Sequence, residues 1–307
     1  MLTFLPGSIL YFISLSLLIV NTLVWSSLLT IGGVIKLLLP FLPIRRLLTR
    51  IMNRLMWSWA TCNGGILYLI SNIEWDVTGL DKLDPNGWYL LISNHVSGFD
   101  IAAQTYLLRN HIPMLKFFLK KELLYVPIMG LGCWALDMPF MHRTNAAKLK
   151  KNPQLKGKDL LTTRKACERF KHMPTSIINY VEGSRFTEEK RLRQNSPYRH
   201  LLRPKASGIA FTLSAMGDQF TNLLNITLVY PETSEKVLTH VMHGRTKKVV
   251  IRVEVLPVPR VDPHVYFSSP EIRVEFQRWL NQLWQIKDQQ IDDIITTHQQ
   301  QQRHSHD

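Results

Sequence analysis

Trp88-Tyr-Leu-Leu-Ile-Ser-Asn-His-Val-Ser-Gly-Phe-Asp100 is the stretch of sequence that decides the fold. Its first half, residues 88–93, is a continuous apolar run, as expected of a central strand that is covered on both faces. A run with helical composition and period follows, from Asp100 to Arg109. A strand that leads directly into a helix predicts the start of an α/β layered domain.

The rest of the chain repeats this alternation of short β-rich runs and helical runs. Further strands are predicted at residues 176–181, 226–230 and 249–255, and further helices at residues 159–172 and 205–216. This order predicts a layered domain with a central, largely parallel sheet and flanking helices.

The N-terminal segment is almost uninterrupted apolar sequence from Leu2 to Leu42, and Lys36 is its only charge. It divides near Asn21 into two stretches, Leu2 to Val20 and Thr22 to Leu42, and each approaches the ~20 residues that span a bilayer as a helix. Two spans, one span and a hairpin within one leaflet all fit this pattern. Four arginines follow, with no acidic residue before Glu74: Arg45, Arg46, Arg50 and Arg54. By the positive-inside rule, this flank and the domain behind it are expected to face the cytoplasm.

The chain therefore divides into four predicted parts. Residues 1–44 form the hydrophobic membrane segment, residues 45–72 a basic and apolar connector helix, and residues 73–295 the layered domain. The domain ends in an amphipathic helix that begins near Pro270 and carries an apolar stripe expected to pack on the domain: Phe276, Trp279, Leu280, Leu283 and Trp284. Residues 296–307 are rich in Gln and His and are expected to be disordered.

The formal net charge of +14 narrows the possible partners. Such a charge is typical of proteins that bind nucleic acid, an anionic membrane or phosphate-bearing substrates. The hydrophobic N-terminus favours the membrane, and no aromatic-and-basic recognition motif for nucleic acid is present. The three cysteines are isolated and no histidine lies at metal-ligand spacing from them, so no metal site is expected.

His95 and Asp100 are the first candidates for chemistry. Ligands bind at the carboxyl ends of strands in open α/β sheets, and His95 follows such an end. On one continuous helix the two side chains would point about 140° apart. They can meet only if His95 precedes the helix and the chain bends near Gly98; Asp100 would then orient the imidazole as a general base. Two structural alternatives remain open. Ser97-x-x-Asp100 also matches a helix capping box, and a single histidine after a strand is commonly structural.

Three other segments carry candidate anion-binding residues. Val181-Glu-Gly-Ser-Arg185 follows a strand, and Gly183 would allow a tight turn that presents Arg185 to a phosphate, with Glu182 or Ser184 holding the loop. The apolar run Pro139-Phe-Met-His-Arg143 ends in a second arginine. Lys205 stands before a helix whose N-terminus could share a bound anion with it. Each segment alone could equally be a surface turn or a solvated strand end.

Taken together and in this order, the four segments resemble the four blocks of the glycerolipid acyltransferase family, from about Trp75 to Trp284. The nearest branch resembles the bacterial inner-membrane lysophosphatidic acid acyltransferases. The resemblance implies that His95 is the general base and Asp100 its orienting partner. It places Asn94, Glu182, Gly183, Ser184 and Arg185 in substrate binding, and implies phosphate contacts for Arg143, Arg185 and Lys205. Three positions depart from the family pattern: Ser184 replaces a threonine, Asp137 replaces a glycine, and Leu228-Val-Tyr-Pro231 has a single proline.

The activity expected from this resemblance is acyl transfer to the free hydroxyl of a lysophospholipid, from lysophosphatidic acid to phosphatidic acid in phospholipid biosynthesis. Acyl-CoA or acyl-carrier protein would be the donor, with no other cofactor and no metal. The expected partners are membrane lipids, the lysophospholipid acceptor and the donor, at the cytoplasmic face of the inner membrane. The alternatives are an acyltransferase for another lysophospholipid and a non-catalytic membrane protein that binds lipid.

Overall fold

The computed structural model describes residues 1–39, 41–141, 173–260 and 263–304. A six-stranded sheet forms the centre of the molecule, in the order β1-β8-β7-β2-β6-β3. All neighbouring strands are parallel except β7 and β8, which are antiparallel. The predicted layered domain with a largely parallel sheet is therefore confirmed. The strands are β1 (Glu74–Thr78), β2 (Tyr89–Ser93), β3 (Leu115–Phe117), β6 (Ser176–Tyr180), β7 (Asn222–Val229) and β8 (Lys248–Leu256).

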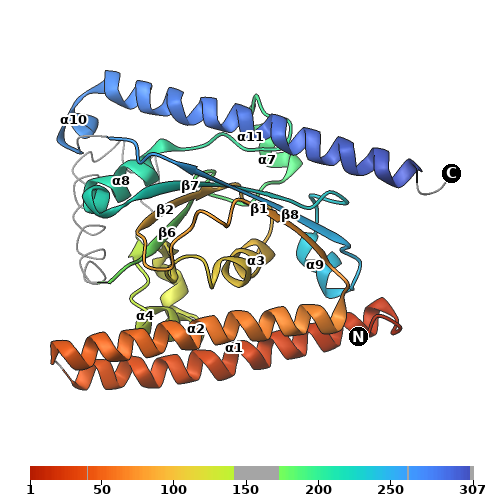
Figure 1. The fold of residues 1–307 in the computed structure, drawn as a ribbon, viewed down its shortest axis with the longest axis horizontal. Coiled ribbons are helices and arrows are strands. Elements are labelled where there is room, and N and C mark those ends of the chain that lie inside the picture. The colour runs from red at the N-terminus through yellow and green to blue at the C-terminus, as the bar shows by residue number, and fades with distance from the viewer. Residues whose placement is uncertain (40, 142–172, 261–262, 305–307) are drawn as a thin grey trace.

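Strand β2 is buried on both faces, as its continuous apolar run predicted. Leu91 belongs to the core cluster on one side of the sheet, and Leu90 and Ile92 belong to the cluster on the other side. Helix α3 (Phe99–Leu108) packs on the first side, next to the N-terminal helices. Helices α8 (Ala206–Met216) and α11 (Pro270–His304) cover the opposite side, so the sheet lies between two helical layers (Figure 1).

The N-terminal apolar sequence forms one helix, α1 (Gly7–Leu38), so the prediction of a division near Asn21 is wrong. Asn21 does not interrupt the helix because a neighbouring helix satisfies its side chain: the amide of Asn21 donates to Oδ1 of Asn63 at 2.7 Å. Of the helices that the structure describes, α1 is the one that is long and apolar enough to cross a membrane. Its 32 residues correspond to a length of about 48 Å.

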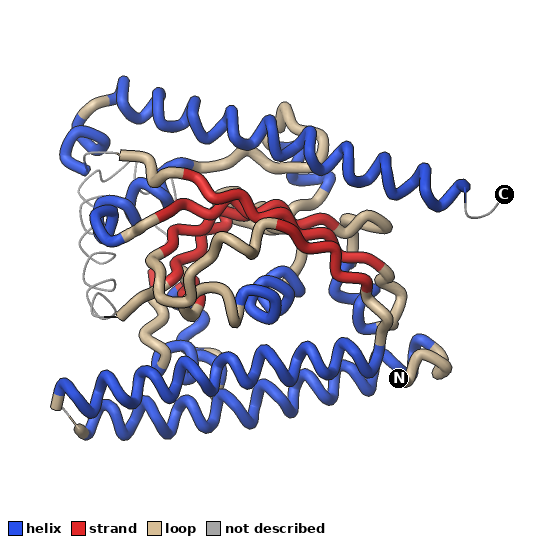
Figure 2. Tube along the Cα trace, viewed as in Figure 1, coloured by secondary structure: helices blue, strands red, loops and turns tan. Residues whose placement is uncertain are grey.

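Helix α2 (Leu42–Ile70) runs back along α1, and the two form a long antiparallel hairpin beneath the domain (Figures 1 and 2). The backbone N–H of Leu2 donates to the carbonyl of Leu69 at 2.6 Å, which brings the start of the chain to the end of α2. Of the three arrangements left open for residues 1–44, two separate spans do not agree with this single helix. The connector predicted at residues 45–72 is the second helix of the hairpin.

Helix α11 extends to His304, so the expected disordered tail from residue 296 is helical over its described part. Near the end of the helix, the ring of His298 contacts Gln302 one turn later at 3.0 Å and lies 3.8 Å from a carboxylate oxygen of Glu232. These contacts, together with the absence of Gly and Pro from the segment, explain why the helix continues. The stripe predicted on α11 packs on the domain, with Phe276, Leu280 and Trp284 buried.

Short elements complete the described chain. A two-stranded sheet joins β4 to β5, and the helical pieces between the main elements are one to two turns long. The elements are β4 (Leu119–Lys120), β5 (Phe140–Met141), η1 (Lys121–Tyr125), α4 (Met129–Ala135), α7 (Glu188–Arg193), η2 (Gly217–Gln219), α9 (Val237–Met242) and α10 (Pro263–Ser268).

Candidate active site

His95 lies in the connection between β2, which ends at Ser93, and α3, which begins at Phe99. The preceding residue ties this connection to the next strand. The side-chain amide of Asn94 donates to the carbonyl of Leu228 at 2.8 Å and accepts from the N–H of Leu228 at 2.9 Å. The amide group of Asn94 therefore serves the fold, and its predicted role in substrate binding remains a prediction.

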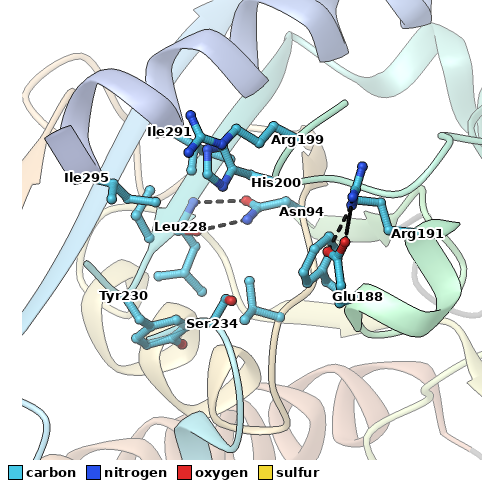
Figure 3. Close-up of a pocket in the computed structure, with 13 residues that line it drawn as sticks. Asn94, Glu188, Arg191, Arg199, His200, Leu228, Tyr230, Ser234, Ile291 and Ile295 are labelled. Carbon is cyan, nitrogen blue, oxygen red and sulfur yellow. Dashed lines mark hydrogen bonds and ion pairs between the residues drawn. The ribbon is translucent and has the colours of Figure 1, made fainter. Parts of the chain in front are cut away.

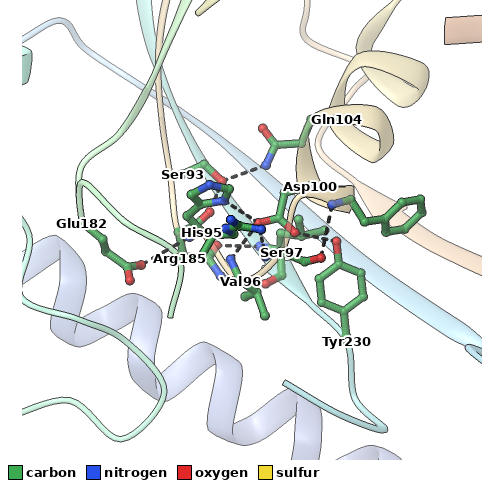
Figure 4. Close-up of polar contacts among 12 residues, drawn as sticks. Ser93, His95, Val96, Ser97, Asp100, Gln104, Glu182, Arg185 and Tyr230 are labelled. Atoms are coloured by element: carbon green, nitrogen blue, oxygen red, sulfur yellow. Dashed lines mark hydrogen bonds and ion pairs between the residues drawn. The ribbon is translucent and has the colours of Figure 1, made fainter. Parts of the chain in front are cut away.

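His95 and Asp100 meet as the bent geometry required. Nδ1 of His95 lies 2.8 Å from Oδ2 of Asp100 (Figure 4). The same oxygen accepts the backbone N–H groups of Val96 at 2.7 Å and Ser97 at 2.9 Å. The capping alternative is thus also present, because Asp100 satisfies backbone donors at the start of α3 while it holds the imidazole. The two interpretations are compatible in this structure.

The two members of the pair differ in exposure. The side chain of Asp100 is completely buried, whereas that of His95 is 15% exposed. The imidazole stacks on the ring of Tyr180, with centroids 4.1 Å apart and planes inclined by 18°. Nε2 of His95 has no hydrogen-bond partner among the described residues. That nitrogen is consequently available to take a proton from a substrate.

Tyr230 is a further member of the site, which the sequence did not reveal. Its hydroxyl donates to Oδ1 of Asp100 at 2.7 Å, so both carboxylate oxygens of Asp100 are engaged. Burial, with the Asp100 carboxylate nearby, raises the pKa of Tyr230 well above its usual value. The phenol therefore keeps its proton and acts as a donor throughout the physiological pH range.

The loop after β6 carries the second candidate motif. Gly183 has a φ of +72°, a conformation that favours glycine and that lets the chain turn back after Val181. Glu182 is buried, and its carboxylate accepts the backbone N–H groups of His95 at 3.4 Å and Leu202 at 3.2 Å. Burial raises the pKa of Glu182 to about 8. Its carboxylate links three segments of the protein around His95.

Lys287 brings helix α11 into the site. It is buried between α11 and the sheet, and its ammonium donates to the carbonyl of Ile226 at 2.5 Å and to Oγ1 of Thr227 at 3.2 Å. Burial lowers the pKa of Lys287 to about 7, and the nearby Glu182 carboxyl acts in the opposite direction. Lys287 was not predicted, because nothing in the pattern of α11 indicates a buried cation.

The exposed side chains of the site carry positive charge. Arg185 and Lys205 are both exposed. A methyl group added at Gly98 would lie 3.7 Å from Nη1 of Arg185, and one added at Gly183 would lie 3.5 Å from Nζ of Lys205. Arg185 therefore lies beside the loop that follows His95, and Lys205 lies beside the turn at Gly183. Arg143, the third predicted phosphate ligand, lies outside the described residues.

A pocket of about 290 Å³ adjoins the pair from the side of Tyr230 (Figure 3). Asn94 and Val96 line its floor, and Ile291 and Ile295 of α11 contribute apolar side chains. The charged groups on its rim are paired within the protein. Arg191 binds Glu188, and Arg199 and His200 bind Asp292. Neither His95 nor Asp100 lines the pocket.

Residues 74–221 match the family model described as "Acyltransferase". This range contains His95, Asp100 and the segment from Glu182 to Lys205. Residues 74–221 are an acyltransferase domain. The resemblance drawn from the four sequence blocks is thereby confirmed.

Curated relatives point to glycerolipid acyltransferases. The chain is 26% identical over 213 residues to the mouse protein named 1-acyl-sn-glycerol-3-phosphate acyltransferase delta. This alignment covers 65% of this chain and 51% of the mouse protein. It is 24% identical over 224 residues to 1-acyl-sn-glycerol-3-phosphate acyltransferase 3 of Arabidopsis thaliana, with 67% of this chain and 54% of the relative covered. The chain thus spans about half the length of these relatives.

The acyltransferase fold is also present in a solved structure. The 1-acyl-sn-glycerophosphate (LPA) acyltransferase PlsC from Thermotoga maritima aligns with a TM-score of 0.58 and 15% identity, over 94% of this chain and 95% of that one. Within the part of the chain that the structure describes, no group of three His, Cys, Asp or Glu side chains could hold a metal ion.

Proposed function

We propose that this acyltransferase moves a fatty acyl group from an acyl thioester to the free hydroxyl of lysophosphatidic acid, which gives phosphatidic acid. The observation that carries the proposal is the state of His95: Asp100 holds Nδ1 at 2.8 Å, while the partly exposed ring leaves Nε2 available. Nε2 takes the proton of the hydroxyl as its oxygen attacks the thioester carbonyl. The tetrahedral intermediate then expels the thiolate, which recovers the proton from the imidazolium. Such general-base help contributes about 10²–10⁴-fold to the rate.

The acceptor phosphate belongs, in this proposal, at the exposed cations near His95. Arg185 and Lys205 supply positive charge there, and Gly183 and Ser184 form the intervening turn. Arg143, which lies outside the described residues, is the third cation that the resemblance assigns to the phosphate. The donor is acyl-CoA or acyl-carrier protein, whose thioester carbonyl must approach the same nitrogen of His95.

The hairpin of α1 and α2 would hold the site at the cytoplasmic face of the inner membrane. Large apolar side chains are exposed along α1, among them Phe12, Leu23 and Ile31, and water is a poor environment for such a surface. Arginines on α2 lie beside this surface and suit anionic lipid headgroups on the cytoplasmic side. A lipid acceptor could then reach His95 from the bilayer.

The test is turnover by the purified full-length protein in detergent or vesicles, with lysophosphatidic acid and a set of acyl-CoA and acyl-carrier-protein thioesters. We expect phosphatidic acid from the wild type and none from His95→Ala, with both proteins showing the same unfolding temperature. Full activity of a folded His95→Ala variant would rule out the mechanism. Lysophosphatidic acid that binds without turnover would indicate a lipid-binding protein instead.

A second acceptor is supported by one comparison. The Caenorhabditis elegans protein named lysophosphatidylinositol acyltransferase 10 matches 85% of this chain, with 24% identity over 279 residues and 66% of that protein covered. Lysophosphatidylinositol therefore belongs in the same assay. If Arg185 and Lys205 bind a phosphomonoester, lysophosphatidic acid will be the better acceptor, and Arg185→Gln will reduce this preference.

A further inference from the structure

We propose that Tyr230 is a positioning residue of the acyl-transfer site, whose hydroxyl fixes the Asp100 carboxylate and, through it, the imidazole of His95. The inference rests on the proposed role of His95 as general base. It assigns a function to a residue that lies outside the pair and is separated from Asp100 by 130 positions in the sequence.

The two oxygens of Asp100 are held unequally. Oδ2 receives three donors, from His95 and from the backbone of Val96 and Ser97. Oδ1 has one partner among the described residues, the hydroxyl of Tyr230 at 2.7 Å. Since Asp100 has no exposed surface, water cannot replace a lost donor without rearrangement. Tyr230 thus determines the rotation of the carboxylate about its Cβ–Cγ bond, and with it the direction in which Oδ2 faces His95.

The position of Tyr230 is itself fixed. It follows directly after β7, and Leu228, two residues earlier, is bonded through both backbone groups to Asn94 beside His95. Its ring lies 6.1 Å from that of Phe99 at the start of α3 and is 4% exposed. Tyr230 follows β7 and His95 follows β2, and these two strands are neighbours in the sheet. The strand pairing therefore holds the Tyr230 hydroxyl next to Asp100.

Tyr180 offers a matched control. Its ring stacks on that of His95, so it belongs to the same site. Its buried hydroxyl, however, has no hydrogen-bond partner among the described residues. Removing the hydroxyl from Tyr180 deletes one atom of the same kind from the same site, without removing a hydrogen bond from Asp100.

The experiment compares wild type, Tyr230→Phe and Tyr180→Phe as purified full-length proteins, with lysophosphatidic acid and one acyl-CoA. For Tyr230→Phe we expect kcat to fall about 5- to 50-fold while both KM values stay within about 2-fold, since a charge-assisted hydrogen bond is lost at a distance from substrate. Tyr180→Phe, which removes no hydrogen bond from Asp100, should lower kcat less than Tyr230→Phe does. In Asp100→Asn, adding Tyr230→Phe should have little further effect, because the two residues act as one unit.

A readout that does not depend on turnover completes the test. The proton between Nδ1 of His95 and Asp100 should give a downfield proton NMR signal, assigned by its loss in His95→Ala. We expect Tyr230→Phe to shift or broaden this signal and Tyr180→Phe to leave it unchanged. An unchanged signal in folded Tyr230→Phe overturns the inference, as does a raised KM with unaltered kcat, which would make Tyr230 a substrate contact. Absence of turnover by the wild type would count against the proposed function alone, since the signal still tests the positioning role.

Discussion

Asn94 and Leu228 exchange two hydrogen bonds across the ends of β2 and β7, so one side-chain amide satisfies both backbone groups of the other residue. Both residues are buried, with 1% of the surface of each exposed. This contact joins the strand that precedes His95 to the strand that precedes Tyr230.

Asn94→Ala is expected to lower the free energy of unfolding by about 2–4 kcal/mol, because it leaves a buried N–H and a buried carbonyl without partners. Chemical or thermal unfolding in detergent measures the loss. Asn86→Ala, at an exposed asparagine, is the control and should change little. If Asn94→Ala instead raises the KM for the acceptor without loss of stability, Asn94 binds substrate as the sequence predicted.

Gly183→Ala should disturb acceptor binding. The φ of +72° disfavours an alanine by about 1 kcal/mol, and the added methyl group would contact the Lys205 ammonium. We expect the KM for lysophosphatidic acid to rise several-fold, while the KM for the donor changes less. Gly217→Ala is the matched control, since Gly217 has a helical backbone and room for a methyl group. Equal effects of the two substitutions would argue against a role of the Gly183 turn.

The buried carboxyl of Glu182 predicts a specific pH dependence of stability. Its pKa rises from 4.5 to about 8 on burial, so between these values the folded protein binds one proton more than the unfolded chain. The free energy of unfolding should therefore fall with rising pH, by up to about 1.4 kcal/mol per pH unit. Glu182→Gln lacks this contribution, and its stability relative to wild type should increase from pH 4.5 to pH 8.

Thermal unfolding of both proteins across this pH range makes the measurement. Glu189→Gln, at an exposed glutamate, should follow the wild-type curve. Parallel curves for Glu182→Gln and wild type would show that the buried carboxyl does not titrate in this window.

The single charge of the N-terminal apolar segment also has a structural explanation. Lys36, near the end of α1, forms an ion pair with Asp137, and both side chains are largely buried. Lys116 lies close to the same carboxylate, and burial lowers its pKa to about 8. Asp137 therefore joins α1 to the domain, and it adopts a φ of 57° there.

Lys36→Met is expected to cost about 3 kcal/mol of stability, because a buried carboxylate loses a partner. Asp137→Asn should cost more, since Lys36 and Lys116 then repel each other without the carboxylate that attracts both. Unfolding temperatures of the purified variants test this order, with exposed Lys82→Met as control. A greater loss of stability from Lys36→Met than from Asp137→Asn would contradict the view that the Asp137 carboxylate compensates both lysines.

Local patterns in the sequence predicted the centre of the sheet well. The apolar run before Asn94 identifies β2 because burial on both faces requires apolar residues throughout. Strand β1 was missed, since its residues from Glu74 to Thr78 lie at the sheet edge and include two acids. Asn21 was misinterpreted because its partner lies on a second helix, which the apolar pattern of the first cannot indicate.

The residues of the candidate site were likewise predicted only in part. The spacing of His95 and Asp100 made the pair a testable hypothesis because both members lie within one bend of the chain. Tyr230 and Lys287 could not be assigned, since their contacts depend on strand order and on the path of α11 across the sheet. Tyr230 belongs to residues 228–231, a segment that stands out in the sequence only for its single proline.

The unequal exposure of His95 and Asp100 has a consequence for covalent labelling. Asp100 is sealed from solvent and its carboxylate is fully engaged, so a carbodiimide that modifies accessible carboxyl groups should not reach it. The imidazole of His95 is open on its Nε2 side and should react with diethyl pyrocarbonate. Diethyl pyrocarbonate should therefore inactivate the folded enzyme by modifying His95. The carbodiimide should modify Asp100 only after the chain unfolds.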